Sequence, residues 1–387
     1  MNDFSAVLAP TSIGGISVRN RLGLAPLNTG MIDEGGLPSV DFQWFHERYA
    51  RAGLGIVFIG GVAVCSSGRS SARSFSLDSK RKSAVLSRTL GGIRDHGALP
   101  IVQLMHAGRQ TNPAEVGGRL LGPSAVACPV LGIVPREMTR ADFEMVTGDF
   151  VNAAKLAEEA GAAVIELHAA HGYLLAEFLS EHANHRRDQY GGSPENRARF
   201  LCDVIREIRS NTNLAVGVRI SGREYVRDGI EPGGLAAVSA RVEEGGAAYI
   251  SVSAGVYSPD DHIMPDRASG EAVNAGLSRI VKHQVQVPVM LAGNMTALES
   301  CVGVLLRGQA DILLMGRALL ADWQLVPKTM HRESVQPCTM LRVCKYHSRR
   351  LPHIACPHDQ ELWARLSKHI SVSDATQLTP APDPGSC

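Results

Sequence analysis

The stretch PVMLAGNMTALESCVGVLLRGQADILLMGR, residues 288–317, holds two short apolar runs on either side of a segment with helical spacing. The runs PVMLAG and DILLMGR are apolar at successive positions, as parallel strands are when both faces of their sheet are covered. The helix predicted between them covers 296–307 and begins at Asn294 or Thr296, because both residue types cap helices. The stretch therefore predicts a strand–helix–strand unit with parallel strands.

The same pattern recurs along most of the chain. Helical spacing is clear at 138–160, where Thr139 is the expected cap and Asp142 lies three residues on, and at 193–210, where Ser193 is the expected cap. Eight strand–helix units in about 310 residues favour a (β/α)8 TIM barrel, with a doubly wound sheet as the alternative. The predicted strands are 21–27, 55–62, 100–106, 163–169, 214–221, 249–255, 288–293 and 311–317.

Three segments lie outside the repeated units. Residues 10–20 predict a β-hairpin that turns at a Gly-Gly pair and plugs the N-terminal mouth of the barrel. The long connection 107–137 follows the third predicted strand, so it should cross the C-terminal face and shape a substrate site. We expect a barrel domain over residues 1–330 and a C-terminal extension over 331–387, whose last residues, 379–387, have the composition of a disordered tail.

Composition narrows the class of protein. Of the 387 residues, 44% are hydrophobic and 20% are charged, which is typical of a globular protein, and the net charge is +1. This balance gives no reason to expect nucleic acid or an anionic membrane as a partner. No signal peptide and no apolar run of membrane-spanning length is visible, and the eight cysteines are scattered. We expect a cytoplasmic enzyme with reduced thiols that acts on a small molecule.

Polar residues gather where predicted strands end, which is where TIM barrels carry their chemistry. Gln103 lies near the end of the third strand, His168 ends the fourth, and Arg219 lies near the end of the fifth. His171 and Tyr173 follow in the loop after the fourth strand. A cation and an amide suit a ring with carbonyl oxygens that gains negative charge on reduction, such as an isoalloxazine. The alternative is that Gln103 and Arg219 are a buried polar pair.

Two short motifs after the seventh and eighth strands indicate a phosphate site. The seventh strand ends with Ala292, Gly293 and Asn294, and the eighth ends with Gly316 and Arg317. Glycine lets backbone N–H groups approach a phosphate, and an arginine neutralises its charge. The barrel is therefore expected to hold a phosphorylated ligand whose far end lies over strands one to five.

Three longer motifs resemble those of one family. HAGR at 106–109, HAAHGYLL at 168–175 and RRDQYGGSPENRARF at 186–200 together resemble the old yellow enzymes, nearest the bacterial ene reductases and 2,4-dienoyl-CoA reductases. Motifs in the same order span residues 20 to 317. The long central motif is specific, whereas AGN or MGR alone is weak.

The resemblance implies non-covalently bound FMN. Pro26, Leu27 and Asn28 would then pass along the flavin, and Gly60 and Gly61 would lie near its ring. By the same mapping the pyrimidine edge would face Gln103, flavin N1 and O2 would face Arg219, and the phosphate would be held by Ala292, Gly293, Asn294, Gly316 and Arg317.

The resemblance also implies a reaction. NAD(P)H would reduce the flavin, and the activated C=C bond of an α,β-unsaturated carbonyl compound would then accept the hydride from flavin N5. His168 and His171 would hold the carbonyl oxygen, and Tyr173 would donate the proton to the other face. No G-x-G-x-x-G motif follows a predicted strand, so both substrates would use one site in turn and the kinetics would be ping-pong. The physiological substrate, the choice of NADH or NADPH and the oligomeric state stay open, although relatives are often dimers or tetramers.

Two departures from the family pattern affect the cofactors. Position 28 is Asn, where many relatives have Cys or Thr, so the flavin potential stays open. The dienoyl-CoA branch carries a four-cysteine iron–sulfur cluster, but this chain offers only Cys338, Cys344 and Cys356, spaced C-x5-C-x11-C. Three thiols cannot fill such a site. We therefore expect a structural remnant without a cluster, and a shifted cluster that recruits His347 is the alternative.

Three other functions are alternatives to this one. His168-x-x-His171 together with His182-x-x-His185 could ligate zinc in a hydrolase, but no H-E-x-x-H motif is present. Within the same fold, relatives oxidise or demethylate amines. A biosynthetic flavoenzyme that catalyses dehydrogenation or isomerisation is a further alternative.

Overall fold

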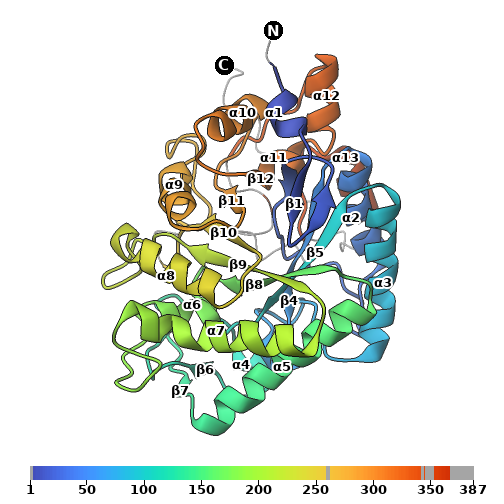
Figure 1. The fold of residues 1–387 in the computed structure, drawn as a ribbon. Coiled ribbons are helices and arrows are strands. Elements are labelled where there is room, and N and C mark those ends of the chain that lie inside the picture. Colours follow the sequence, from blue (N-terminus) through green and yellow to red (C-terminus); the bar gives the residue numbers. More distant parts are fainter. Residues whose placement is uncertain (1–2, 259–261, 341–343, 345–352, 367–387) are drawn as a thin grey trace, which may run out of the picture.

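The computed structural model describes residues 3–258, 262–340, 344 and 353–366, and its centre is a closed barrel of parallel strands (Figure 1). The chain order of the strands is also their order around the barrel, and β12 closes on β3. Closure confirms the TIM barrel and excludes the doubly wound sheet. All eight predicted strands are present: β3 (Leu22–Leu24), β4 (Ile56–Ala63), β5 (Leu99–Met105), β8 (Val164–Ala169), β9 (Ala215–Ser221), β10 (Tyr249–Ser253), β11 (Val289–Ala292) and β12 (Ile312–Met315).

Helices surround the barrel on its outside (Figure 1). The longer ones are α2 (Val40–Arg51), α3 (Lys80–Asp95), α5 (Arg140–Glu159), α7 (Pro194–Asn211), α8 (Pro232–Glu244), α9 (Ala275–Gln284) and α10 (Leu298–Leu306). The shorter elements are α1 (Ser5–Leu8), the 3-10 turn η1 (Ser66–Gly68), α4 (Pro113–Val116), α6 (Leu174–Leu179), α11 (Arg317–Ala321), α12 (Leu325–His331), α13 (Gln360–Leu366) and the parallel pair β6 (Leu121–Gly122) and β7 (Arg136–Glu137).

Two of the three predicted helix starts are confirmed. The side chain of Asp142 and the Thr139 cap form a capping box at α5, and Ser193 Oγ accepts a hydrogen bond from the Asn196 N–H at α7. The start of α10 differs from the prediction. It follows Ala297, because neither expected cap is available: the Asn294 amide donates to the carbonyl groups of residues 266 and 270 and its oxygen accepts from Arg317, while the Thr296 hydroxyl donates to Glu271.

The N-terminal hairpin closes one mouth of the barrel. Strands β1 (Thr11–Ile13) and β2 (Ile16–Val18) are antiparallel and turn at Gly14 and Gly15, both with positive φ (54° and 82°). Ile13 and Val18 are buried in the apolar cluster inside the barrel. A Cβ at Gly14 would lie 2.6 Å from the Cβ of Ala215, the first residue of β9, so the hairpin plugs the N-terminal mouth as expected.

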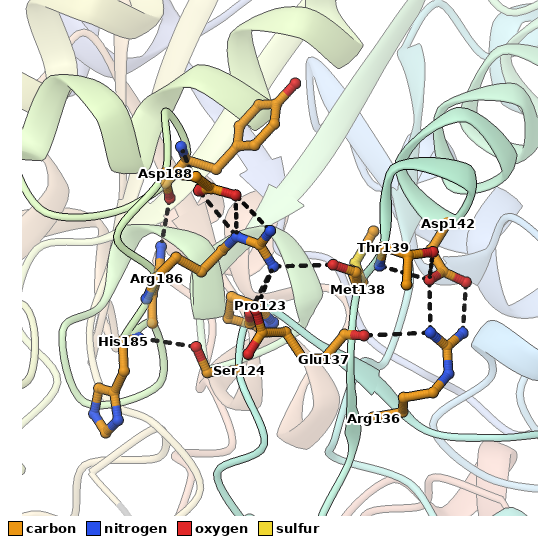
Figure 2. Close-up of polar contacts among 12 residues, drawn as sticks. Pro123, Ser124, Arg136, Glu137, Met138, Thr139, Asp142, His185, Arg186 and Asp188 are labelled. Carbon is orange, nitrogen blue, oxygen red and sulfur yellow. Dashed lines mark hydrogen bonds and ion pairs between the residues drawn. The ribbon is translucent and has the colours of Figure 1, made fainter.

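The connection after β5 is anchored by residues 185–188, just before α7 (Figure 2). Arg186 Nη1 donates to the carbonyl oxygens of Pro123 and Met138, both at 3.0 Å, and Arg186 Nη2 lies 2.5 Å from an oxygen of Asp188. The N–H of His185 donates to Ser124 Oγ at 3.0 Å. The long central motif therefore has a structural use, because it fixes the connection over residues 107–137.

The described part of the C-terminal extension packs on the barrel beside α2. Arg48 of α2 and Asp359 form a buried ion pair of 2.6 Å, and the Ile354 N–H donates to the Thr29 carbonyl at 2.7 Å. Helix α13 lies against α2 (Figure 1). The expected tail at 379–387 and His347 lie outside the described residues.

Candidate active site

A cavity opens at the carboxyl ends of the barrel strands and holds about 1180 Å³ of empty space, including its open mouth. Its lining comes from the ends of several barrel strands and from the loops after them, which is where a TIM barrel places its ligand. Most of the predicted site residues line it: Pro26, Leu27, Asn28, Gly61, Gln103, His168, His171, Tyr173, Arg219, Ala292, Gly293, Asn294, Gly316 and Arg317.

Gly60 is the predicted site residue that does not line this cavity. A Cβ there would lie 2.3 Å from the backbone nitrogen of Leu27 and 2.5 Å from the carbonyl carbon of Pro26. Glycine therefore lets β4 approach the segment after β3 closely. Gly60 shapes the cavity through that segment, and Gly61 is the glycine exposed to the cavity.

The three residues predicted for catalysis lie together at one end of the cavity. The His168 ring is 5.0 Å from the His171 ring and 4.8 Å from the Tyr173 ring, measured between centroids. His171 has a left-handed backbone (φ 60°), which is uncommon for a residue with a side chain and is often found at functional sites. Its N–H donates to Ser221 Oγ and its carbonyl accepts from Gln110 Nε2, so the surroundings fix this conformation.

Both histidines are buried and neutral. Burial lowers the pKa of His168 well below its usual value, and the Arg219 charge lowers it further. Burial also lowers the pKa of His171, with His168 and Arg219 adding to the effect. The Ala170 N–H donates to His168 Nδ1 at 3.3 Å, so the ring proton of the neutral His168 lies on Nε2. A neutral imidazole with its proton on Nε2 can donate a hydrogen bond there.

Next to these three residues lie an amide and a cation, which suit a ring that gains negative charge on reduction. Gln103 and Arg219 are buried on β5 and β9 and both line the cavity. Arg219 Nη2 donates to Ser253 Oγ at 3.2 Å, and the same oxygen lies 2.8 Å from His171 Nε2. Ser253 therefore links the guanidinium to the histidine pair.

Asn28 meets a group of serines in the segment after β4. Its Nδ2 donates to Ser74 Oγ at 2.8 Å and to Ser70 Oγ at 3.4 Å, and its Oδ1 accepts from the Gly30 N–H. Asn28 is thus oriented by neighbours that a Cys or Thr at this position would contact differently.

The far end of the cavity has the chemistry of a phosphate site. Arg317 Nη2 donates to Asn294 Oδ1 at 2.5 Å, and both residues line the cavity together with Gly293 and Gly316. A Cβ at Gly316 would meet only Ala25 Cβ, at 3.8 Å, so the backbone here is open to a ligand. With a cation and two glycines at this end and Gln103 and Arg219 toward the other, the residues fit FMN.

Several cavity residues were missed by sequence reasoning: Ser70, Met105, Ser253, Tyr257, Asn274 and Met340. Ser253 and Met105 were detectable, since each lies on a predicted strand at the inward-facing spacing. Tyr257, whose hydroxyl is 3.2 Å from that of Tyr173, had no such signal because it lies in an irregular loop. Met340 reaches the cavity from the C-terminal extension.

Among the described residues, no group of three or more His, Cys, Asp or Glu side chains is arranged to hold a metal ion. None of the helices described is both long and apolar enough to cross a membrane.

A sequence model of the NADH:flavin oxidoreductase / NADH oxidase family matches residues 6–335. Among characterised proteins, the chain is 31% identical to an NADPH dehydrogenase of Geobacillus sp. (strain WCH70), over 82% of this chain and 91% of that protein. It is 32% identical to an NADH oxidase of Thermoanaerobacter brockii, over 87% of this chain but 53% of that protein. The chain therefore spans about half the length of the second relative.

Solved structures with the same fold include a complex of 2-naphthoyl-CoA reductase with 2-naphthoyl-CoA (TM-score 0.83, 24% identity, 89% of this chain and 54% of that one). An old yellow enzyme homologue from Zymomonas mobilis also matches (TM-score 0.75, 22% identity, 86% of this chain and 94% of that one). At these identities the likeness extends to the fold alone.

Proposed function

The chain belongs to the NADH:flavin oxidoreductase / NADH oxidase family, and from that premise we propose that it reduces the activated C=C bond of α,β-unsaturated carbonyl compounds. Family membership and the NAD(P)H-dependent relatives identify FMN as the cofactor and NAD(P)H as the reductant. When bound, FMN supplies a centre that accepts hydride from NAD(P)H and passes it to a substrate. The barrel over residues 1–330 would hold it, with 331–387 as an extension.

The observation that carries the proposal is the grouping of His168, His171 and Tyr173 beside Gln103 and Arg219 in one cavity. Hydride addition to an enone places negative charge on the carbonyl oxygen. Neutral imidazole N–H groups aimed at that oxygen stabilise the charge without adding a formal one, and the loss of one such donor typically costs about 3 kcal/mol of barrier.

The histidine tautomers are consistent with this role. His168 carries its proton on Nε2, as its contact with the Ala170 N–H requires. Ser253 Oγ accepts from Arg219 Nη2 and lies 2.8 Å from His171 Nε2, so a Ser253 hydroxyl that donates to Nε2 would leave the His171 proton on Nδ1. Each ring then has one N–H donor for the carbonyl oxygen.

Tyr173 is the proposed proton donor. Its ring packs edge-on against His168, and its hydroxyl lies in the same cavity. A phenol placed on the side of the substrate opposite the flavin can protonate the α-carbon, which gives net trans addition. The proton is replaced from solvent, because Tyr173 is partly exposed.

An anaerobic titration of the purified protein followed by absorbance tests the proposal. We expect a flavin spectrum that NADH or NADPH bleaches and that 2-cyclohexenone restores, with ping-pong kinetics at steady state. Flavin that is bleached but not restored by any enone would refute the substrate class. Flavin that neither nucleotide bleaches would favour an amine oxidase or a redox-neutral role, and a protein that takes up no FMN would contradict the site itself.

A further inference from the structure

One row of side chains crosses the middle of the barrel below the cavity. Gln103 on β5, Glu166 on β8, Gly217 on β9 and Tyr249 on β10 are successive register partners on four neighbouring strands. Gln103 lines the cavity, whereas Glu166 does not. Glu166 is completely buried and has no place in the proposed reaction.

The next row toward the cavity contains His168 and Arg219, which both line it. His168 and Arg219 lie two residues further along β8 and β9, so their side chains point to the same side of the sheet as Glu166 and Gly217. They are also register partners of each other. Glu166 therefore lies directly under the residues that face the cavity, and Arg219 is a cation that acts on its carboxyl.

Glu166 fixes the carboxamide of Gln103. Glu166 Oε1 accepts a hydrogen bond of 2.7 Å from Gln103 Nε2, and the Gln103 Oε1 accepts from the Gly61 N–H at 3.2 Å. The nitrogen and the oxygen of the Gln103 amide therefore each have a fixed partner. A flipped amide would place its oxygen against the Glu166 carboxyl oxygen and its NH2 group against the Gly61 N–H. The orientation of Gln103 in the cavity follows from this one carboxylate and one backbone N–H.

The remaining neighbours keep water away from the carboxyl. A Cβ at Gly217 would lie 2.0 Å from the Tyr249 ring, so glycine makes room for that ring in the row next to Glu166. Tyr249 and Ser251 also adjoin the carboxyl. Burial raises the pKa of Glu166 to about 7, while Arg219 and the hydrogen bond from Gln103 act in the opposite direction.

We propose that Glu166 is a positioning residue of the flavin site, which orients the Gln103 carboxamide and offsets the charge of Arg219 under the pyrimidine edge. This rests on the proposed placement of FMN, and it does not depend on which compound accepts the hydride. The hydrogen bond between Glu166 and Gln103 fixes how Gln103 meets the pyrimidine edge. The negative charge of Glu166 limits how strongly Arg219 favours the electron-rich reduced flavin. These two effects can be separated by substitution.

Glu166→Gln keeps the length of the side chain and an oxygen for Gln103, and at a pH well above the Glu166 pKa of about 7, where the potentials are measured, it removes the charge. Arg219 then loses one compensating negative charge, so reduced flavin should be favoured over oxidised flavin by about tenfold, which is a shift of about +30 mV in the two-electron midpoint potential. Glu166→Asp keeps the charge but shortens the reach to Gln103. It should weaken FMN binding about tenfold and shift the potential less.

The matched control is Glu177→Gln, which also replaces a completely buried carboxyl next to an arginine, but outside the cavity. Potentials are measured by anaerobic spectroelectrochemistry of the holoprotein, and FMN dissociation constants by flavin fluorescence. A positive shift in Glu166→Gln with none in Glu177→Gln supports the proposal. A wild-type potential in Glu166→Gln, or an equal shift in both variants, overturns it.

Glu166→Asp decides the matter if Glu166→Gln does not fold, because an unchanged FMN dissociation constant in Glu166→Asp also overturns the proposal. The wild type serves as a check on the function itself. A wild type that binds FMN but reduces no enone refutes the substrate class and leaves this test intact. An enone-reducing wild type with an unshifted Glu166→Gln variant refutes only the role of Glu166.

Discussion

Replacement of Tyr173 by Phe removes one hydroxyl group and leaves the rest of the site in place. The Tyr173 ring lies 4.8 Å from the His168 ring, edge to face, and a phenylalanine ring keeps that contact. The hydroxyl of Tyr173 is 3.2 Å from the hydroxyl of Tyr257, and the substitution removes this contact. The substitution therefore tests proton donation with little change in packing.

The magnitude follows from the exposure of the group. A positioned general acid typically contributes about 10²–10⁴-fold to a rate. Tyr173 is partly exposed at the cavity, so water can take over proton delivery in the variant. We therefore expect the low end of the range, about 100-fold, which corresponds to about 2.7 kcal/mol of barrier.

Anaerobic stopped-flow absorbance separates the two half-reactions. Flavin reduction by NADPH should keep its wild-type rate in Tyr173→Phe, because no proton from this phenol is needed. Reoxidation by 2-cyclohexenone should fall about 100-fold. Tyr257→Phe is the control, since it breaks the same hydroxyl contact and should change reoxidation by less than about threefold. Reoxidation of Tyr173→Phe at the wild-type rate would show that the proton comes from elsewhere.

Four further predictions test other parts of the molecule. His171→Asn, which tolerates the left-handed backbone, should slow reoxidation by an enone about 100-fold in the same stopped-flow assay. Arg317→Ala should raise the FMN dissociation constant about 10- to 100-fold by fluorescence, through loss of a charge-assisted contact to the phosphate. Asp359→Asn breaks the buried ion pair with α2 and should lower the free energy of unfolding in urea by about 3–5 kcal/mol; Arg140→Ala, at an exposed pair, should change it by less than about 1 kcal/mol. Burial lowers the pKa of His106 from 6.5 to about 4, so the unfolded chain binds a proton between those values that the folded chain does not. The free energy of unfolding should therefore fall as the pH drops through that window. In urea titrations at several pH values, its slope against pH should be smaller in His106→Gln by the equivalent of about one proton.

The barrel was predictable because its strands carry a local signal. Each strand is buried on both faces, so each appears in the sequence as a short apolar run, and all eight were found within a few residues of their ends. The start of α10 was not predictable from local sequence. Asn294 has the chemistry of a cap, but the loop at 266–270 binds its side chain, and the helix begins after Ala297. A tertiary contact decided that boundary.

The site was predictable where strand ends and motifs coincide, and it was not where residues arrive from irregular segments. His168, Gln103 and Arg219 lie on predicted strands at inward-facing positions, and the barrel brings them to one face. Tyr257 and Met340 reach the cavity from segments without periodicity, so neither alternation nor capping could place them. Gly60 was expected near the flavin ring and stays a prediction; what the structure adds is that a side chain there would meet the backbone of Pro26 and Leu27.

The position of Glu166 was predictable only in part. In the run VIELHA it is two residues before His168, so alternation alone places both polar side chains on the same inner face of a strand whose other positions are apolar. What alternation cannot give is the register that sets Glu166 beside Gln103 and Gly217 on the two neighbouring strands. That register gives the carboxyl its hydrogen bond and leaves room for the Tyr249 ring. A buried acid on a barrel strand is costly unless its neighbours satisfy it, and here those neighbours include two residues that face the cavity. The charge of Glu166 is therefore expected to affect the flavin through them, although Glu166 itself does not reach the cavity.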